Sequence, residues 1–212
     1  MPTRLPTLTL TILCTTAAWP ALAQDAANRP AAQRVDGNFV RANAAKSPEW
    51  PVIGLDYAET RYSRLNQLTD KNVKDLGLAW TYDLQSTRGV EATPVVVDGV
   101  MYVSAAWSVV HAINARNVQK LWTFDPKIDK GVWGQRGCCD VVNRGVALWK
   151  GKVYVGSFDG RLIALDAATG KVVWEKNTFE GQKGSYTITG APRVYKGKVI
   201  IGNGGAEYGV RG

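Results

Sequence analysis

The segment RGVALWKGKVYVGSFDGRLIALDAATGKVVW, from Arg144 to Trp174, is divided into short apolar runs by turn-forming residues. Lys150-Gly151 separates the first two runs, and Gly170 precedes the last run, which ends in tryptophan. Polar–Gly pairs are typical of tight hairpin turns, and short alternating apolar runs are typical of strands. The segment therefore predicts four short antiparallel strands.

The same pattern occurs in two other parts of the chain. ATPVVVDGVMYVSAAWSVVHAINARNVQKLW, residues 92–122, also has apolar strands, a polar–Gly turn and a closing tryptophan. GAPRVYKGKVIIGNGGAEYGVRG, residues 190–212, begins the pattern a third time. Trp122 and Trp174 lie 174 − 122 = 52 residues apart, and Trp80 in LGLAWTYDL is the expected end of an earlier unit.

These repeats favour an all-β fold of propeller blades. Four-stranded repeats of about 40–50 residues are typical of propellers, and the recurrent tryptophan would fill the gap between neighbouring blades. An ordinary β-sandwich, the alternative, would not require the same turn and tryptophan at matching positions. From about residue 50 there is room for roughly three to three and a half blades, whereas closed propellers have about 4–8. We therefore expect the N-terminal part of a longer protein.

The first 23 residues have the features of a cleavable signal peptide. Arg4 supplies the positive charge, LTLTILCTTAAW supplies a short apolar core, and ALA, residues 21–23, gives the small-residue cleavage pattern before Gln24. The apolar run is too short and too rich in threonine for a stable membrane span. The sequence predicts export to the periplasm, and Cys14 would leave with the signal peptide.

The charged residues are scattered singly along the chain. Without Arg4 the chain has 25 basic and 18 acidic residues, a net charge of 25 − 18 = +7. No basic run and no RNA-binding aromatic signature occurs, so nucleic acid is not an expected partner. Attraction to an acidic partner or a membrane surface and a plain solubility role both stay open.

Two short helices are expected before the repeats. FVRANAA, residues 39–45, has helix-forming composition. In LTDKNVKDLGLAW, Thr69 or Asp70 is a candidate cap and Gly77 a stop, so a short helix would lead into a strand ending at Trp80.

RGCCDVVNRG contains the adjacent pair Cys138 and Cys139, the two cysteines that remain after signal cleavage. In an oxidising compartment this favours a bond within the pair. Such a bond closes a minimal loop and adds almost nothing to stability by loop closure. It forms a rigid, polarizable disc suited to lying against a flat molecule. Two reduced buried thiols and a redox switch remain alternatives.

Four motifs occur in order on these repeats: GVEATPVVVDG, GCCDVVNRGVA, ITGAP and GAEYGVRG. In this combination, residues 35–212 closely resemble the pyrroloquinoline quinone (PQQ) alcohol dehydrogenases, above all the quinohaemoprotein alcohol (ethanol) dehydrogenases. The resemblance implies an eight-bladed β-propeller with tryptophan docking, of which residues 24–212 would be the N-terminal part. It also implies oxidation of primary, ethanol-like alcohols to aldehydes by hydride transfer to PQQ activated by Ca²⁺.

The resemblance assigns cofactor-binding residues. The Cys138–Cys139 ring would stack on one face of the quinone. Arg144 would contact the quinone oxygens and carboxylate region, because its guanidinium has several fixed donors and stays charged. Glu91 would bond the cofactor, and the Thr189 hydroxyl would donate to a PQQ carboxylate. Without the resemblance, these would be a surface arginine, a turn carboxylate and a strand threonine.

The last motif, GAEYGVRG, supplies three more positions. Gly205 and Ala206 match small residues whose main chain approaches the cofactor closely, and Glu207 matches a calcium ligand. Taken alone, Glu207 would be a solvated turn residue. This glycine-rich run does not fit a phosphate-binding or dinucleotide-binding motif.

Other functional groups of the family have no counterpart in this sequence. The catalytic aspartate and an asparagine metal ligand are expected beyond Gly212. No Cys-x-x-Cys-His motif occurs, so any haem c would also lie downstream, and His111 is expected to be structural. Expected partners are a small alcohol and an electron acceptor such as a cytochrome c. The alternatives are a non-enzymatic periplasmic propeller scaffold and a quinoprotein for methanol, sugars or polyols.

Overall fold

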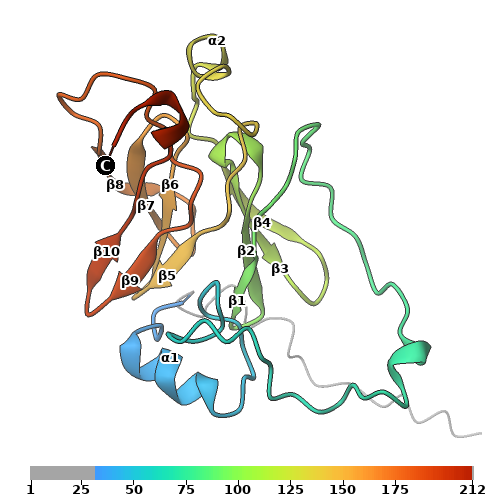
Figure 1. Cartoon of the computed structure of the whole chain (residues 1–212). Coiled ribbons are helices and arrows are strands. Elements are labelled where there is room, and N and C mark those ends of the chain that lie inside the picture. Colours follow the sequence, from blue (N-terminus) through green and yellow to red (C-terminus); the bar gives the residue numbers. More distant parts are fainter. Residues whose placement is uncertain (1–31, 212) are drawn as a thin grey trace, which may run out of the picture.

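The computed structural model describes residues 32–211, so the predicted signal peptide lies outside the described residues. In this part of the chain, two four-stranded antiparallel sheets stand side by side like two blades (Figure 1). The first sheet contains β1 (Val95–Val97), β2 (Val100–Ser104), β3 (Val110–Asn114) and β4 (Lys120–Phe124). The second contains β5 (Ala147–Trp149), β6 (Lys152–Gly156), β7 (Arg161–Asp166) and β8 (Val172–Asn177). A hairpin follows, β9 (Arg193–Tyr195) and β10 (Lys198–Ile200).

The polar–Gly turns form as the sequence predicts. In each turn both central residues have positive φ, the conformation of the type I′ hairpin turn, which glycine adopts without a steric penalty. The three turns are Asp98-Gly99, Lys150-Gly151 and Lys196-Gly197. They join β1 to β2, β5 to β6 and β9 to β10, so the first hairpin of each unit follows from local turn chemistry.

The closing tryptophan of the first sheet packs against the second sheet. The Trp122 side chain is only 8% exposed, and its indole Nε1 donates to the Ala167 carbonyl oxygen at 3.0 Å. Its ring lies directly over Gly170, where an added Cβ would come within 2.6 Å of the ring. Apolar residues of both sheets complete one shared core. The tryptophan therefore docks on the neighbouring blade, as predicted.

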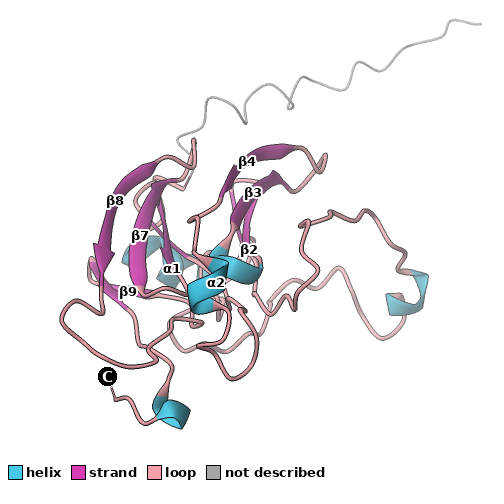
Figure 2. Cartoon of the chain, turned by 90° about the horizontal axis from the view of Figure 1, so that it is seen from above, coloured by secondary structure: helices cyan, strands magenta, loops and turns pink. Residues whose placement is uncertain are grey.

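The third unit packs less extensively. Val194 of β9 lies in a small cluster with Ala147, Tyr154 and Ala164 of the second sheet. The closing tryptophan of that sheet, Trp174, is 38% exposed. Strand β8, which contains Trp174, is exposed along its whole length and forms the outer edge of its sheet (Figure 2).

The predicted helix near residues 39–45 is present as α1 (Gly37–Ala44). The carboxylate of Asp36 accepts hydrogen bonds from the backbone N–H groups of Asn38 and Phe39, which caps the helix. The remaining helical elements are α2 (Lys130–Trp133) and the 3-10 turns Val73–Asp75, Ala106–Ser108 and Ala206–Tyr208. No helix within residues 32–211 is long and apolar enough to cross a bilayer.

The predicted strand ending at Trp80 is wrong. The 3-10 turn Val73–Asp75 occurs where a short helix was expected, but residues 76–94 form no strand. The first part of this segment extends away from both sheets (Figure 1), and Leu78 is 83% exposed, whereas Tyr82 packs edge-on against His111 of β3. A strand needs a neighbouring strand to satisfy its backbone groups, and no described strand pairs with this segment. The described chain therefore has two complete sheets and one hairpin.

Candidate functional site

Three of the predicted cofactor residues lie in the loops that lead into the first strands of successive units. Glu91 lies four residues before β1 (95 − 91 = 4), Arg144 three before β5 (147 − 144 = 3) and Thr189 four before β9 (193 − 189 = 4). The first strands of the units are neighbours, so the loops that enter them lie at the same end of the stack (Figure 1). The repeat itself therefore gathers these side chains.

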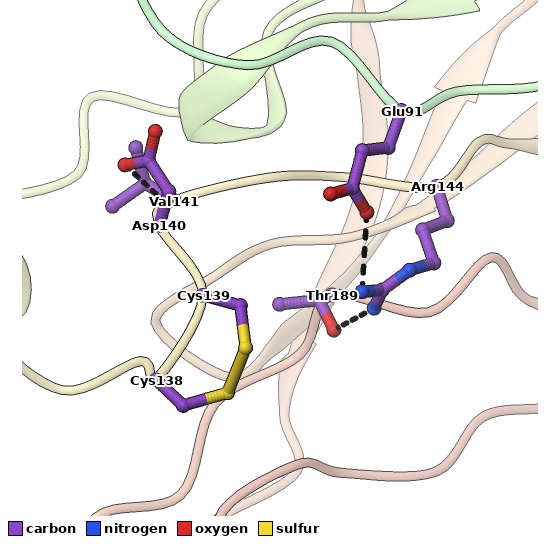
Figure 3. The surroundings of a disulfide bond; sticks show 7 residues. All are labelled: Glu91, Cys138, Cys139, Asp140, Val141, Arg144 and Thr189. Carbon is purple, nitrogen blue, oxygen red and sulfur yellow. Dashed lines mark hydrogen bonds and ion pairs between the residues drawn. A yellow bond between two sulfur atoms is a disulfide. The ribbon is translucent and has the colours of Figure 1, made fainter.

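The three side chains are in contact (Figure 3). Arg144 Nη2 lies 3.1 Å from Glu91 Oε2, and Arg144 Nη1 donates to Thr189 Oγ1 at 2.7 Å. The backbones are joined as well: Thr93 N–H donates to the Arg144 carbonyl oxygen at 3.3 Å, and Arg144 N–H donates to the Thr189 carbonyl oxygen at 2.8 Å. Arg144 is thus the central member of the cluster.

Arg144 is held by a buried asparagine beside it. The side chain of Asn143 donates to the Gly156 carbonyl oxygen at 2.9 Å and to Ser108 Oγ at 3.2 Å. Its carbonyl oxygen accepts the N–H of Gly145 at 3.1 Å. The loop before β5 is therefore anchored in the core while the Arg144 side chain remains exposed. The motif VVNRG gave no hint of this role to sequence reasoning.

Next to the cluster is a cavity of about 690 Å³, a size common for small-molecule sites. Its charged lining residues are Arg61, Arg144, Arg193 and Glu91, three cations and one anion, a net charge of 3 − 1 = +2. Arg193 Nε lies 2.5 Å from Glu59 Oε1, and this hydrogen bond lowers the pKa of Glu59. With Glu59 included, the charged side chains at the cavity sum to 3 − 2 = +1, and this excess of arginine suits a ligand that carries carboxylates. Sequence reasoning missed Arg61 and Arg193, since neither lies in a recognisable motif.

The cysteine pair lies in the loop that follows α2. The Sγ atoms of Cys138 and Cys139 are bonded to each other, and both residues are exposed. Figure 3 shows this ring in the same neighbourhood as Glu91, Arg144 and Thr189. An exposed disulfide ring offers a flat, polarizable surface beside the cluster of polar side chains.

The GAEYGVRG positions are placed differently. Gly204 lines the cavity, but Gly205, Ala206 and Glu207 are not among its lining residues. Gly205 has φ of +117°, and a Cβ there would lie 2.3 Å from the Ser185 carbonyl oxygen, so the position requires glycine. The cofactor contacts of Gly205 and Ala206 stay predictions.

The described residues do not by themselves form a calcium site. Within residues 32–211, no group of three His, Cys, Asp or Glu side chains is positioned to hold a metal ion. Glu207 is exposed on the turn Ala206–Tyr208 and supplies one carboxylate. Calcium takes about 6–8 oxygens, so most ligands would have to come from elsewhere.

Residues 50–209 match the family model for the β-propeller domain of PQQ-containing glucose, ethanol and alcohol dehydrogenases. The chain belongs to this family. The match covers most of the chain and includes the loop residues of the cluster, the disulfide and the GAEYG turn.

Relatives in the PQQ family are close in sequence. The chain is 70% identical, over all of its length, to a quinohemoprotein alcohol dehydrogenase of Comamonas testosteroni, of which it covers 30%. It is 64% identical over 79% of its length to a 1-butanol dehydrogenase (cytochrome c) of Thauera butanivorans, of which it covers 24%. The chain thus spans between 24% and 30% of the length of these relatives.

Two solved dehydrogenase structures share the fold. The crystal structure of the quinohemoprotein alcohol dehydrogenase from Comamonas testosteroni matches 85% of this chain with a TM-score of 0.84 and 78% identity, covering 27% of that chain. A europium-containing methanol dehydrogenase matches 82% of this chain with a TM-score of 0.75 and 38% identity, covering 30% of that chain. The propeller fold predicted from the repeats is confirmed.

Proposed function

We propose that the full-length protein is a PQQ-dependent dehydrogenase that oxidises primary, ethanol-like alcohols to aldehydes. The observation that carries this proposal is the contact of Glu91, Arg144 and Thr189 beside an exposed disulfide ring and a cationic cavity. The relatives named above, one for 1-butanol, support a primary alcohol as the substrate. PQQ, when bound, would supply the adjacent carbonyl groups that accept the hydride.

The residues of this chain would bind and orient the cofactor. Arg144 would direct its guanidinium donors at the oxygens of the ligand, while Glu91 and Thr189 fix the plane of that guanidinium. The Cys138–Cys139 ring would cover one face of the flat ligand and exclude water from it. Anchoring by Asn143 holds Arg144 in place before the ligand arrives, which reduces the ordering cost of binding.

Glu207 is the contribution of this chain to the proposed Ca²⁺ site. Its carboxylate would provide one or two oxygens, and residues outside 32–211 together with the cofactor would provide the rest. The relative of known structure that contains europium makes a trivalent lanthanide the alternative ion. Reconstitution of the protein with Eu³⁺ in place of Ca²⁺ would show which of the two ions the site uses.

The remaining features are further proposals. Export to the periplasm rests on the signal features of residues 1–23. A cytochrome c as electron acceptor, or a haem c domain in the same protein, is supported by the names of the relatives. A methanol, sugar or polyol substrate remains the second candidate, because the methanol dehydrogenase also shares the fold. Attraction to a membrane surface stays a prediction.

Reconstitution of the full-length apoprotein tests the function. Arg144→Ala loses hydrogen bonds to charged groups worth about 1.5–3 kcal/mol each, so PQQ affinity should fall steeply and added Ca²⁺ should not restore it. Glu207→Ala should lower metal affinity, and excess Ca²⁺ should restore part of the activity by mass action. Arg116→Ala, on the turn between β3 and β4, is the control.

The proposal fails if wild-type protein binds no PQQ, or if both site variants reconstitute like the control. Mass spectrometry of the unreduced holoenzyme provides a second check. Cys138 and Cys139 should be bonded to each other, and two thiols that alkylate freely would contradict the stacked ring.

A further inference from the structure

Two segments that carry cofactor residues are joined by two ion pairs. Residues 88–93 contain Glu91, and residues 138–144 contain the disulfide and Arg144. The Glu91–Arg144 pair joins them at one end. Arg88 and Asp140, 52 residues apart in sequence, join them at the other. This second pair touches no group of the proposed cofactor cluster, so its role is not explained by cofactor contact.

The geometry of the second pair is that of a two-point clamp. Arg88 Nε donates to Asp140 Oδ2 at 3.1 Å, and Arg88 Nη2 donates to Asp140 Oδ1. A guanidinium that meets both oxygens of a carboxylate fixes orientation as well as distance. The contact also keeps the carboxylate ionised, since the Arg88 hydrogen bond lowers the pKa of Asp140 to about 2.

Asp140 follows Cys139 directly, so the clamp acts on the residue at which the chain leaves the disulfide ring. The Asp140 backbone has φ of +72°, and its Oδ1 accepts the N–H of Val141 at 2.7 Å (Figure 3). Val141 is fully buried, and its carbonyl oxygen accepts the N–H of Trp107 at 2.8 Å. Asp140 is therefore fixed on its C-terminal side by the core and at its side chain by Arg88.

The other side of the ring is also held. A Cβ at Gly137 would lie 2.7 Å from the ring of the buried Phe158, so the main chain of Gly137 packs directly on that ring. Between these two anchors, Cys138 and Cys139 are exposed. The ring thus has little protein around it to set its tilt other than its two neighbours in sequence.

The Arg88–Asp140 pair is exposed, so it can fix the position of the disulfide loop without contributing much to the stability of the fold. The Arg88 and Asp140 side chains are 49% and 30% exposed, and exposed ion pairs contribute little to folding. The clamp connects the disulfide loop with the loop of Glu91 but adds little stability. It is therefore suited to fixing the orientation of these two loops relative to each other. Its loss should change the ring and the site while leaving global stability almost unchanged.

We propose that Arg88 and Asp140 are positioning residues that hold the Cys138–Cys139 ring in a fixed orientation toward the cluster of Glu91, Arg144 and Thr189. Neither would touch the cofactor. The cofactor part of this inference rests on the proposed function, whereas the effect on the ring itself does not.

The test compares Arg88→Gln and Asp140→Asn in the full-length protein. Asparagine keeps an oxygen that can accept the Val141 N–H, so Asp140→Asn removes the clamp and leaves that hydrogen bond. Glu180→Gln, which breaks the exposed Lys176–Glu180 pair on the outer blade edge, is the matched control. Arg88→Lys keeps the charge but not the two-point geometry and should recover only part of the effect.

Two readouts are measured beside the melting temperature. The first is the rate at which dithiothreitol reduces Cys138–Cys139 in the apoprotein. The second is the Kd for PQQ by absorbance titration. We expect both variants to change the reduction rate in the same direction and to bind PQQ roughly tenfold more weakly, about 1.4 kcal/mol, with melting close to wild type.

The direction in which each variant changes the reduction rate distinguishes a change in the orientation of the ring from a change in the charge beside it. The two substitutions remove opposite charges beside the ring, so a purely electrostatic effect would shift reduction by the dithiothreitol thiolate in opposite directions. Opposite shifts, control-like values, or losses that appear only with a lowered melting temperature would each overturn the proposal. Failure of wild-type protein to bind PQQ would sink the proposed function, and the reduction rates would still decide the role of the clamp.

Discussion

Trp122 and Trp174 close two sheets of almost identical design, yet one is docked and the other is not. Trp122 is 8% exposed and donates to Ala167 of the next sheet, whereas Trp174 is 38% exposed on the outer edge. Both sheets have the same strand order and pair their strands in the same antiparallel manner. The difference lies in the neighbour: Trp122 meets Ala167 and Gly170, and no described residue plays their part for Trp174.

The comparison shows that the tryptophan motif is half of an interface. The indole comes from one unit, while the carbonyl oxygen and the bare glycine surface come from the next. The second unit therefore supplies the docking site, formed by Ala167 and Gly170, into which the tryptophan of the first unit packs. We call this docking site the socket. The stability of a blade then depends on its neighbour, as in other repeat folds.

The largest effect is expected for Trp122→Ala. Removing a buried indole and its hydrogen bond should cost about 3–5 kcal/mol of unfolding free energy, whereas Trp174→Ala should cost about 1 kcal/mol in this chain. Urea unfolding of both variants measures the difference. In the full-length protein the gap should narrow if a further unit covers Trp174. Equal losses in the 212-residue chain would break the comparison.

Gly170→Ala tests the socket. At φ of +70° a Cβ is strained, and it would also lie 2.6 Å from the Trp122 ring. Gly197→Ala is the control, because its φ is +75° and a Cβ there meets nothing within 4 Å. We expect about 1–2 kcal/mol for Gly197→Ala and a further 1–3 kcal/mol, roughly, for Gly170→Ala. The excess should disappear when Trp122 is also alanine, and its persistence would show that the ring is not the cause.

The smallest expected effect is a pH dependence of stability that arises from a histidine in the first sheet and has no counterpart in the second. His111 and Ile163 hold the same register position, opposite Val103 and Val155. Burial lowers the pKa of His111, assisted by the charge of Lys120. Its contribution to stability is therefore complete above the unfolded value of about 6.5 and is lost as pH falls toward the lower folded value.

His111→Ile should therefore flatten the stability profile below about pH 6.5 and leave it almost unchanged above. Melting temperatures across that range measure the slope. A wild-type slope that survives the substitution would place the titrating group elsewhere.

The local features of the fold could be read from the sequence, and the contacts between distant loops could not. The three polar–Gly turns and the docked Trp122 follow from short-range patterns. Trp80 shows the limit of such patterns. LGLAWTYDL has the composition of a strand, but a strand forms only beside a partner, and a sequence window does not contain the partner.

In the candidate site, too, residues in sequence motifs could be predicted, whereas contacts between distant loops could not. The motifs and the family resemblance singled out Glu91, Arg144 and Thr189, and the structure places Arg144 in contact with the other two; their binding of the cofactor stays a prediction. Neither the Arg88–Asp140 clamp nor Asn143 has a periodic or compositional signal, because each depends on three-dimensional proximity between loops. For Asp140 the one available hint was its place directly after the cysteine pair.

The backbone links from Thr93 to Arg144 and from Arg144 to Thr189 have an evolutionary consequence. A chain that grows by duplicating one unit copies the same entry loop each time, already joined to the copy before it. The residues of each copied loop can then change independently, so this loop supplies a glutamate in one unit, an arginine in the next and a threonine in the third. A binding site with many contacts can arise in this way one substitution at a time, with the framework that aligns those contacts inherited in advance.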